Sequence, residues 1–190
     1  MPKNMSKNTP KAAPRIMFKV RPSAIPNPEH ANFPRAGFAR RIGALLYDFL
    51  VIVAVIMLAT AAALGIVALL VGMGIITLHE GVDHASVLEG NWLYRLYLLA
   101  VIFWFYAGFW KRGGQTLGMR TWRLKVQNDD GSTITWRQAL IRFVTALFGI
   151  SNLGVLFNNN NLAWHDALAK CEVVVLSDEA NKLRNWKKFA

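Results

Sequence analysis

The apolar run from Ile42 to Leu78 limits the fold more than any other feature of the sequence. About 20 apolar residues are enough for a helix to cross the hydrocarbon core of a bilayer. This run is longer and contains no proline, so we predict one tilted spanning helix over residues 38–74. Two short helices with a turn at residues 61–65 are disfavoured because Ala-Ala-Ala promotes helix. Asp48 lies inside the run, where an unpaired carboxylate is costly.

A second spanning helix is predicted over residues 92–110. Trp92 and Tyr94 lie at one end and Trp110 at the other, as expected for aromatic side chains at the two membrane interfaces. Arg95 is close enough to its end to reach the head groups. The preceding segment, 79–91, is acidic and contains no lysine or arginine.

A third apolar segment, residues 136–157, is interrupted by Arg142, Asn152 and two glycines. A full crossing would put the lysines and arginines of the C-terminal region on the opposite side from the other basic segments, against the positive-inside rule. We therefore favour a segment that enters the membrane and returns, broken at residues 149–154. A spanning segment is the alternative.

Two short β elements are predicted outside the membrane. The Asp-Gly turn signal in NDDG separates two strand-like pieces, which predicts a hairpin over residues 122–136. CEVVVL predicts a strand at 172–176 that pairs with WRLKV, since an isolated hairpin is only marginally stable. The expected fold is an all-α membrane protein with two transmembrane helices, a third membrane-embedded segment and this small β element.

Composition and charge support a membrane location. Hydrophobic residues make up 54% of the chain and charged residues 17%, against about 25% charged in typical soluble domains. The 22 lysines and arginines outnumber the 11 acids, but they lie at the edges of apolar runs, so we expect anionic lipid head groups and no nucleic acid as partners. The same distribution predicts a multi-pass membrane protein with its N-terminus and residues 111–137 in the cytoplasm.

The remaining features bound the domain organisation and the chemistry. We expect a disordered basic tail over 1–36, a membrane domain over 37–176 and a charged tail over 177–190.

A single cysteine, Cys171, excludes an intramolecular disulfide. GGQTLGMR lacks the Lys-Ser/Thr of a phosphate-binding loop and follows a membrane helix, and HEGVDH is not a helical zinc motif. We expect no catalytic residue, no cofactor, no metal and no enzymatic activity.

Three ordered motifs resemble the RDD family of small integral membrane proteins: Arg41 with Asp48, the segment GGQTLGMRTWRLKVQNDDGSTITWRQALIR, and LAWHDALAKCEVVV. The resemblance covers residues 38–176. It implies that the arginine and two aspartates for which the family is named are Arg41, Asp48 and Asp166 here. The chain departs from the pattern at Lys170, where relatives often have glycine, and at Met119-Arg120. The resemblance implies a location in the bacterial inner membrane. Relatives have been associated with sodium–proton exchange and with membrane protein quality control.

The charged residues of these motifs are expected to form one intramembrane or interfacial cluster of Arg41, Asp48, Arg142 and Asp166. Seven residues separate Arg41 from Asp48, about 10 Å along a helix, which is too far for a direct bond. Asp48 therefore needs another partner or is protonated. Arg142 is the first choice as its partner, and Arg40, Arg112 and Arg120 are the alternatives. Asp166 either closes this cluster or caps a short helix over 167–171, and the two roles are compatible. A basic interfacial loop is predicted at Arg112, Arg120 and Arg123.

Two functions follow as hypotheses. A structural ion pair at Asp48 favours a membrane interaction or assembly module, acting alone, as a homo-oligomer or with other membrane proteins. An acid inside a membrane also marks functional sites. The alternative is therefore an ion or small-solute transporter that exchanges sodium or protons at Asp48.

Overall fold

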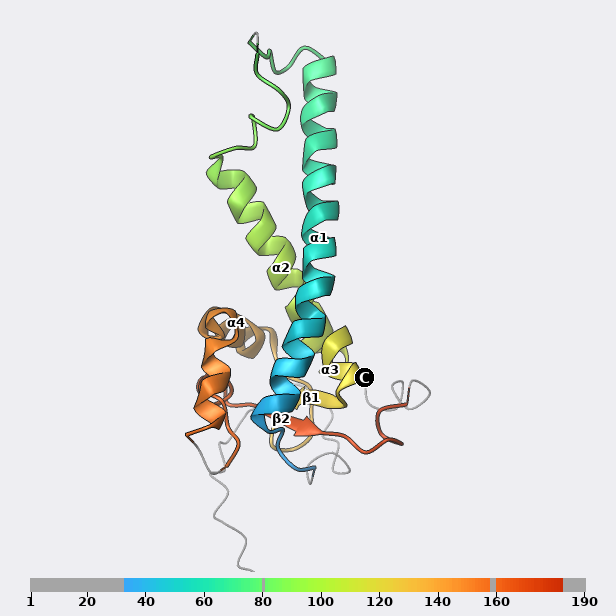
Figure 1. The fold of residues 1–190 in the computed structure, drawn as a ribbon, viewed down its shortest axis with the longest axis vertical. Coiled ribbons are helices and arrows are strands. Elements are labelled where there is room, and N and C mark those ends of the chain that lie inside the picture. The colour runs from blue at the N-terminus through green and yellow to red at the C-terminus, as the bar shows by residue number, and fades with distance from the viewer. Residues whose placement is uncertain (1–32, 80, 158–159, 183–190) are drawn as a thin grey trace, which may run out of the picture.

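The computed structural model describes residues 33–79, 81–157 and 160–182. Two long helices, α1 (Phe38–Gly72) and α2 (Trp92–Arg112), cross near one end of the molecule and diverge toward the other (Figure 1). The shorter elements gather at the end where α1 begins. They are α3 (Leu117–Thr121), β1 (Leu124–Gln127), α4 (Trp136–Thr145), the 3-10 helix η1 (Leu147–Val155), α5 (Trp164–Ala169) and β2 (Glu172–Val175). We call these shorter elements, with the first turns of α1, the head.

Both long helices have the length and apolar character of membrane spans. The 35 residues of α1 extend about 52 Å at 1.5 Å per residue, longer than a hydrocarbon core of about 30 Å. The predictions of helices over 38–74 and 92–110 are confirmed to within two residues at each end. The chain is a membrane protein, and its spanning helices contact the lipid bilayer.

The head contains a two-stranded antiparallel sheet. Leu124 pairs with Val175 and Gln127 with Glu172, so the prediction that WRLKV and CEVVV are neighbours is confirmed. On the other side of β2, the backbone of Ala36 donates to Val173 O at 2.8 Å.

The hairpin predicted over residues 122–136 is wrong in its second half. The turn forms, with Asn128 N donating to Ser132 O at 2.9 Å, but the partner of β1 is β2. The amide of Asn128 holds the segment after the turn by donating to Ser132 Oγ and Thr133 O. Thr135 then begins α4 with a capping box to Gln138. Helix initiation therefore uses the residues that were expected to form a strand.

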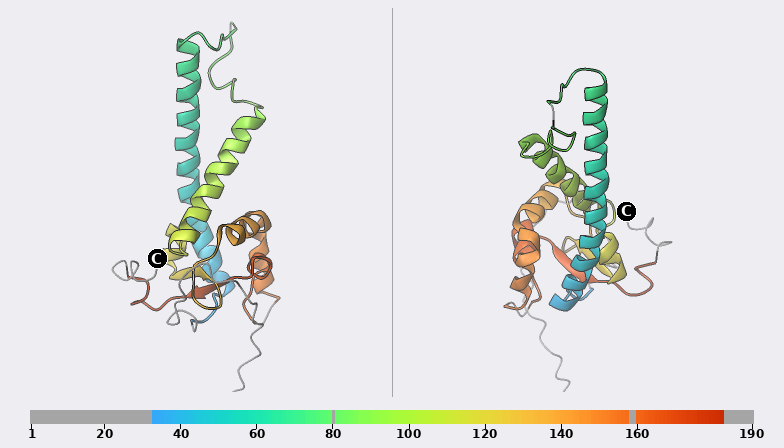
Figure 2. Two further views of the ribbon diagram at one scale, coloured as in Figure 1. Left: turned by 180° about the vertical axis from the view of Figure 1, so that it is seen from behind. Right: turned by 45° about the horizontal axis from the view of Figure 1, so that its top comes forward.

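The buried core lies in the head, where the lower halves of α1 and α2 meet the short elements, as the rotated views also show (Figure 2). Its largest fully buried side chains include Leu124, Ile134 and Val126. The outer parts of the two long helices bury few side chains in the protein itself. The molecule is thus a compact head from which two membrane helices extend.

The third apolar segment is bent. The segment over 136–157 is broken as predicted, but the break follows Thr145 and comes before the expected 149–154. The directions of α4 and of residues Gly149–Val155 in η1 differ by 91°. Gly149 lies at the bend with φ of +95°, a conformation that residues with a side chain rarely adopt. The length and composition of the pair allow it to be counted as a third candidate span.

The predicted tails fall largely outside the described residues, which exclude 1–32 and 183–190. The described part of the C-terminal tail is attached to the head. Asn181 receives a hydrogen bond from Gln115 Nε2 at 2.9 Å and donates to Arg120 O at 3.0 Å.

Candidate functional site

Two arginines from different helices share one aspartate inside the head. Arg41 Nη1, from the first turn of α1, donates to Asp166 Oδ2 at 2.5 Å. Arg142 Nη1, from α4, donates to Asp166 Oδ1. Asp166 is fully buried in the first turn of α5, and both arginines are buried as well. We call Arg41, Arg142 and Asp166 the Arg–Asp–Arg cluster.

The other donors of the two guanidinium groups differ in their contacts. Arg41 Nε donates to Ala36 O at 3.0 Å, and its Nη2 donates to Asn161 O at 3.2 Å. The Arg142 guanidinium lies over the ring of Trp110 at 5.0 Å, and its buried Nε has no hydrogen-bond partner among the described residues. The shared ion pair with Asp166 allows both buried charges to persist, because an unpaired buried ion is strongly destabilising. The cluster joins α1, α4 and α5 and holds one surplus positive charge.

His165 and Cys171 complete the surroundings of Asp166. His165 Nε2 lies 3.2 Å from Asp166 Oδ1, and its backbone amide donates to Ser151 Oγ. Burial lowers the pKa of His165, and the nearby arginines lower it further, so the imidazole is neutral near pH 7. Burial raises the pKa of the Cys171 thiol, against a smaller opposing effect of Arg142. His165 therefore packs in the head as a neutral side chain.

Asp48 lies apart from this cluster, and the predicted pairing with Arg142 is wrong. Its Oδ2 accepts a hydrogen bond from Thr116 Oγ1 at 2.5 Å, and its Oδ1 accepts from the backbone of Gly118 at 2.8 Å. Thr116 Oγ1 in turn accepts from Met119 N at 3.2 Å. Asp48 and Thr116 together cap the first turn of α3, where free amides and the helix dipole favour a carboxylate.

Gly118 explains how α3 approaches α1 so closely. A Cβ at this position would lie 2.2 Å from the carbonyl oxygen of Ala44 and 2.9 Å from Asp48 Cγ. The glycine spacing of GGQTLG, which resembles a phosphate-binding loop, here permits contact between a loop and a membrane helix.

The predicted basic loop does not form one site. Arg112 is exposed in the last turn of α2. Arg123 pairs with the exposed Asp178 at 2.5 Å, and Arg120 Nη2 donates to Asn181 O at 3.3 Å. Arg120 and Arg123 thus attach the C-terminal segment to the head.

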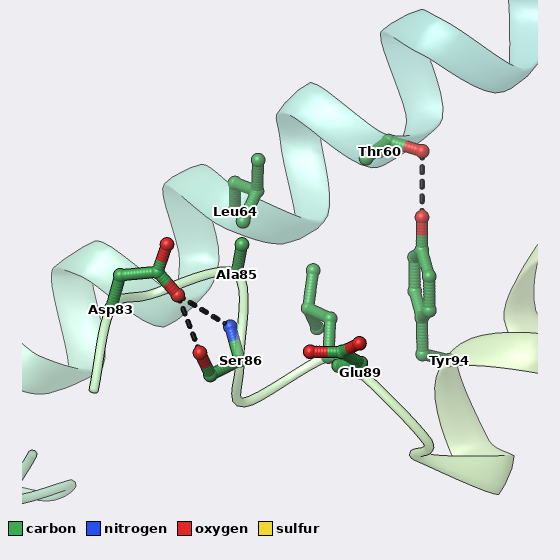
Figure 3. A pocket seen from close by; sticks show the side chains of 8 residues that line it. Thr60, Leu64, Asp83, Ala85, Ser86, Glu89 and Tyr94 are labelled. Atoms are coloured by element: carbon green, nitrogen blue, oxygen red, sulfur yellow. Dashed lines mark hydrogen bonds between the residues drawn. The ribbon is translucent and has the colours of Figure 1, made fainter. Parts of the chain in front are cut away.

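A separate pocket lies between the diverging long helices (Figure 3). It has a volume of about 360 Å³ and is lined by Thr60 and Leu64 of α1, Tyr94 of α2 and part of the connecting loop. The Thr60 and Tyr94 hydroxyls are hydrogen bonded at 2.7 Å. Thr60 is 12 residues beyond Asp48, about 18 Å along α1, so this pocket and the Asp48 cap are distinct regions.

Several residues of the two charged regions were not predicted as site residues. Thr116 and Gly118 hold Asp48, while Trp110 and Cys171 border Arg142. Thr116 carried a usable signal, since threonine before a short helix is a common cap. No sequence pattern pointed to Trp110 or Cys171 as site residues, because only the folded chain brings them close to α4. The helix containing Asp166 begins at Trp164, earlier than the expected 167, and no side chain caps its N-terminus.

Comparison with known proteins supports one assignment. No curated protein and no solved structure matches the chain. The model of the RDD family matches residues 35–170, a range that contains Arg41, Asp48, the GGQTLG loop and Asp166. The match covers most of the chain and both charged regions, and the protein therefore belongs to the RDD family.

Proposed function

We propose that this chain is a non-enzymatic membrane assembly module. In this proposal the head fixes the directions of α1 and α2, and an exposed face of α1 binds the corresponding helix of a second copy. The charges of the Arg–Asp–Arg cluster support it because they bind one another across three elements. They stabilise the head and are not presented to a substrate.

One observation carries the proposal. Small side chains follow one another along α1 on the side away from its buried residues, and they are exposed: Ala54, Ala61, Gly65, Ala68 and Gly72. The spacing of seven, four, three and four residues keeps them on one helical face. Small residues on such a face let two membrane helices approach closely, which favours association where the hydrophobic effect is weak. A second copy with the same orientation in the membrane presents the same face of α1. Two copies can therefore associate through a two-fold symmetric interface.

Disulfide crosslinking in native membranes tests this arrangement. In a Cys171→Ala background, Gly65→Cys is expected to give a crosslinked dimer on mild oxidation. Ile66→Cys is the matched control, since it lies at the same depth but is rotated by about 100°. Equal crosslinking at both positions, or none at Gly65→Cys, would contradict the proposed interface.

The competing proposal is a sodium or proton carrier that uses Asp48. The observation that favours it is the hydrogen bonding of Asp48. In the part of the chain that the structure describes, its carboxylate accepts from one hydroxyl and one backbone amide. Vesicles containing only this protein decide between the two. Sodium or proton flux that disappears in Asp48→Asn, with the protein still folded, would establish a carrier. A protein that crosslinks through α1 and carries no flux fits the assembly module.

A further inference from the structure

The polarity of the bent segment is reversed relative to that of a helix in water. In α4, Gln138 and Arg142 are buried, whereas Leu140 and Val144 are exposed. In η1, Ser151 and Asn152 are buried. The outer surface of the segment is apolar, with exposed Leu140, Ile141, Val144, Ile150, Leu153, Leu156 and Phe157. A helix that faces water places polar side chains outward, so this surface fits a hydrocarbon environment.

Contacts place both ends of this segment at the same end of the molecule. Near its start, Gln138 Nε2 donates to Ala169 O and Lys170 O, next to β2. Just after its end, Asn160 O accepts from Arg35 and Asn161 O accepts from Arg41. Arg35 and Arg41 flank the first residue of α1. The α4–η1 segment therefore begins and ends on the same side of the head, beside β2 and the first turn of α1.

The segment is also too short to cross in one direction. The ten residues of α4 extend about 15 Å at 1.5 Å per residue, against a hydrocarbon core of about 30 Å. The chain then turns by 91° into η1. It does not continue along the direction in which it entered.

The apolar surface of the segment is continuous with that of a spanning helix. The ring of Trp136, at the start of α4, lies edge-on to that of Trp104 in α2, with 5.1 Å between centroids. Phe143 packs similarly on Phe103 at 5.4 Å. Trp104 and Trp136 are both exposed, so the lipid that surrounds α2 also reaches α4. Tryptophan is common at the membrane interface, and the exposed Arg137 beside Trp136 suits anionic head groups.

We infer that α4 and η1 form a lipid-binding foot: they enter only the leaflet nearest the head, bury their outer apolar surface among its acyl chains, and do not cross the bilayer. The two long helices are then the only crossings within the described part of the chain. This foot is the lipid-facing part of the head, and it holds the head against one membrane face together with α1 and α2.

Spin labelling of the full-length protein in vesicles of phosphatidylcholine and phosphatidylglycerol tests the inference. Single cysteines are introduced in a Cys171→Ala background at Val144 and Leu153 for the foot, and at the exposed Asn160 just after it. Leu58→Cys, on the lipid-exposed part of α1, is the deep control, and His84→Cys, in the loop between the long helices, is the aqueous control. Collision with oxygen and with a water-soluble nickel chelate reports the depth of each label.

The inference requires labels at Val144 and Leu153 to favour oxygen over the nickel chelate, at depths shallower than that of Leu58. Modification of Asn160→Cys, in the polar residues just after the foot, by an impermeant thiol reagent must come from the side opposite to His84→Cys. Modification of both from the same side would show a third crossing and overturn the inference. Labels at Val144 and Leu153 that are as open to nickel as His84, or closed to both reagents, would overturn it by showing water or protein at this surface. Leu140→Cys replaces Val144→Cys if the latter does not fold.

Discussion

At the residue scale, the position of Asp48 is explained by hydrogen-bond donors and not by a cation. Its two carboxylate oxygens accept from Thr116 Oγ1 and Gly118 N, and both donors belong to the first turn of α3 or its cap. An acid in a membrane helix can therefore be satisfied by a neighbouring helix N-terminus. The charge of Arg142 is used by Asp166 instead.

Asp48→Asn is expected to lower the free energy of unfolding by about 1.5–3 kcal/mol, the usual range for hydrogen bonds to a charged group. Thr116→Val removes the same contact from the other side, so the double variant should lose less than the sum of the two single losses. Chemical denaturation in detergent measures all three. Adding Arg142→Gln to Asp48→Asn should increase the loss of stability. If Arg142→Gln instead recovered stability, it would indicate an ion pair between Asp48 and Arg142, contrary to the observed contacts.

Lys125 gives the fold a pH dependence. Burial in β1 lowers the pKa of Lys125 from its usual 10.5 to about 8, and its ammonium donates to Gly131 O at 3.3 Å. Between these pH values the unfolded chain binds a proton that the folded chain has released. The contribution of Lys125 to the unfolding free energy therefore increases as the pH rises from about 8 to about 10.5.

The difference in unfolding free energy between the wild type and Lys125→Met isolates this effect, because the raised pKa of Cys171 acts in the opposite direction in both proteins. The wild type should gain stability relative to Lys125→Met across this pH window. A difference that stays constant from pH 7 to pH 10.5 would show that Lys125 titrates normally in the folded protein.

At the scale of elements, α3 connects the second membrane helix to the first. It is only five residues long, too short to be stable alone. Its N-terminus is capped by Asp48 and Thr116, and its approach to α1 depends on the absence of a side chain at Gly118.

Gly118→Ala is expected to destabilise the protein by roughly 1–3 kcal/mol, the range for an overpacked site. The added methyl group would overlap the carbonyl oxygen of Ala44, which belongs to helix backbone and cannot rotate away. Gly108→Ala in α2 is the control, since nothing lies within 4 Å of its Cβ position. Thermal unfolding in detergent should show a lower midpoint for Gly118→Ala than for Gly108→Ala, and equal midpoints would exclude close packing at α3.

At the scale of the whole molecule, the Arg–Asp–Arg cluster decides how the head is assembled. Arg41 is 125 residues from Asp166 in the sequence, and Arg142 is 24 residues away. The cluster therefore forms only when the first, fourth and fifth α-helices are in place. It joins the start of the first membrane helix to elements that lie beyond the second.

Asp166→Asn is expected to destabilise the protein by about 3–5 kcal/mol, because it leaves two buried guanidinium groups without a counter-charge. Asp178→Asn is the matched control: it removes an ion pair whose aspartate is 82% exposed, and it should cost less than about 1 kcal/mol. Protein level in membranes and denaturation in detergent measure both. Similar losses for the two variants would mean that the cluster contributes no more than a surface pair.

The sequence alone determined the membrane class, the two spanning helices, the pairing of the short strands and the family resemblance. The spanning helices and the individual strands depend on local apolar length, on aromatic residues at helix ends and on strand propensity, all of which are visible within about 20 residues. The pairing of the strands followed from the marginal stability of an isolated hairpin, and the resemblance followed from three motifs in order along the chain. The sequence also singled out Lys170, where relatives often have glycine. Lys170 ends α5 at φ of 53°, a conformation that glycine adopts more readily than other residues.

Only the tertiary structure decided which charges meet. From the sequence, Arg142 could form an ion pair with either Asp48 or Asp166. Helical spacing does not distinguish between these two partners. The choice depends on the 91° bend after α4 and on the return of the chain through α5. It depends equally on α3, because the backbone amide of Gly118 donates a hydrogen bond to Asp48. Arg142 is then able to pair with Asp166. Burial makes each unsatisfied charge costly, so the fold that satisfies all of them together is the stable one.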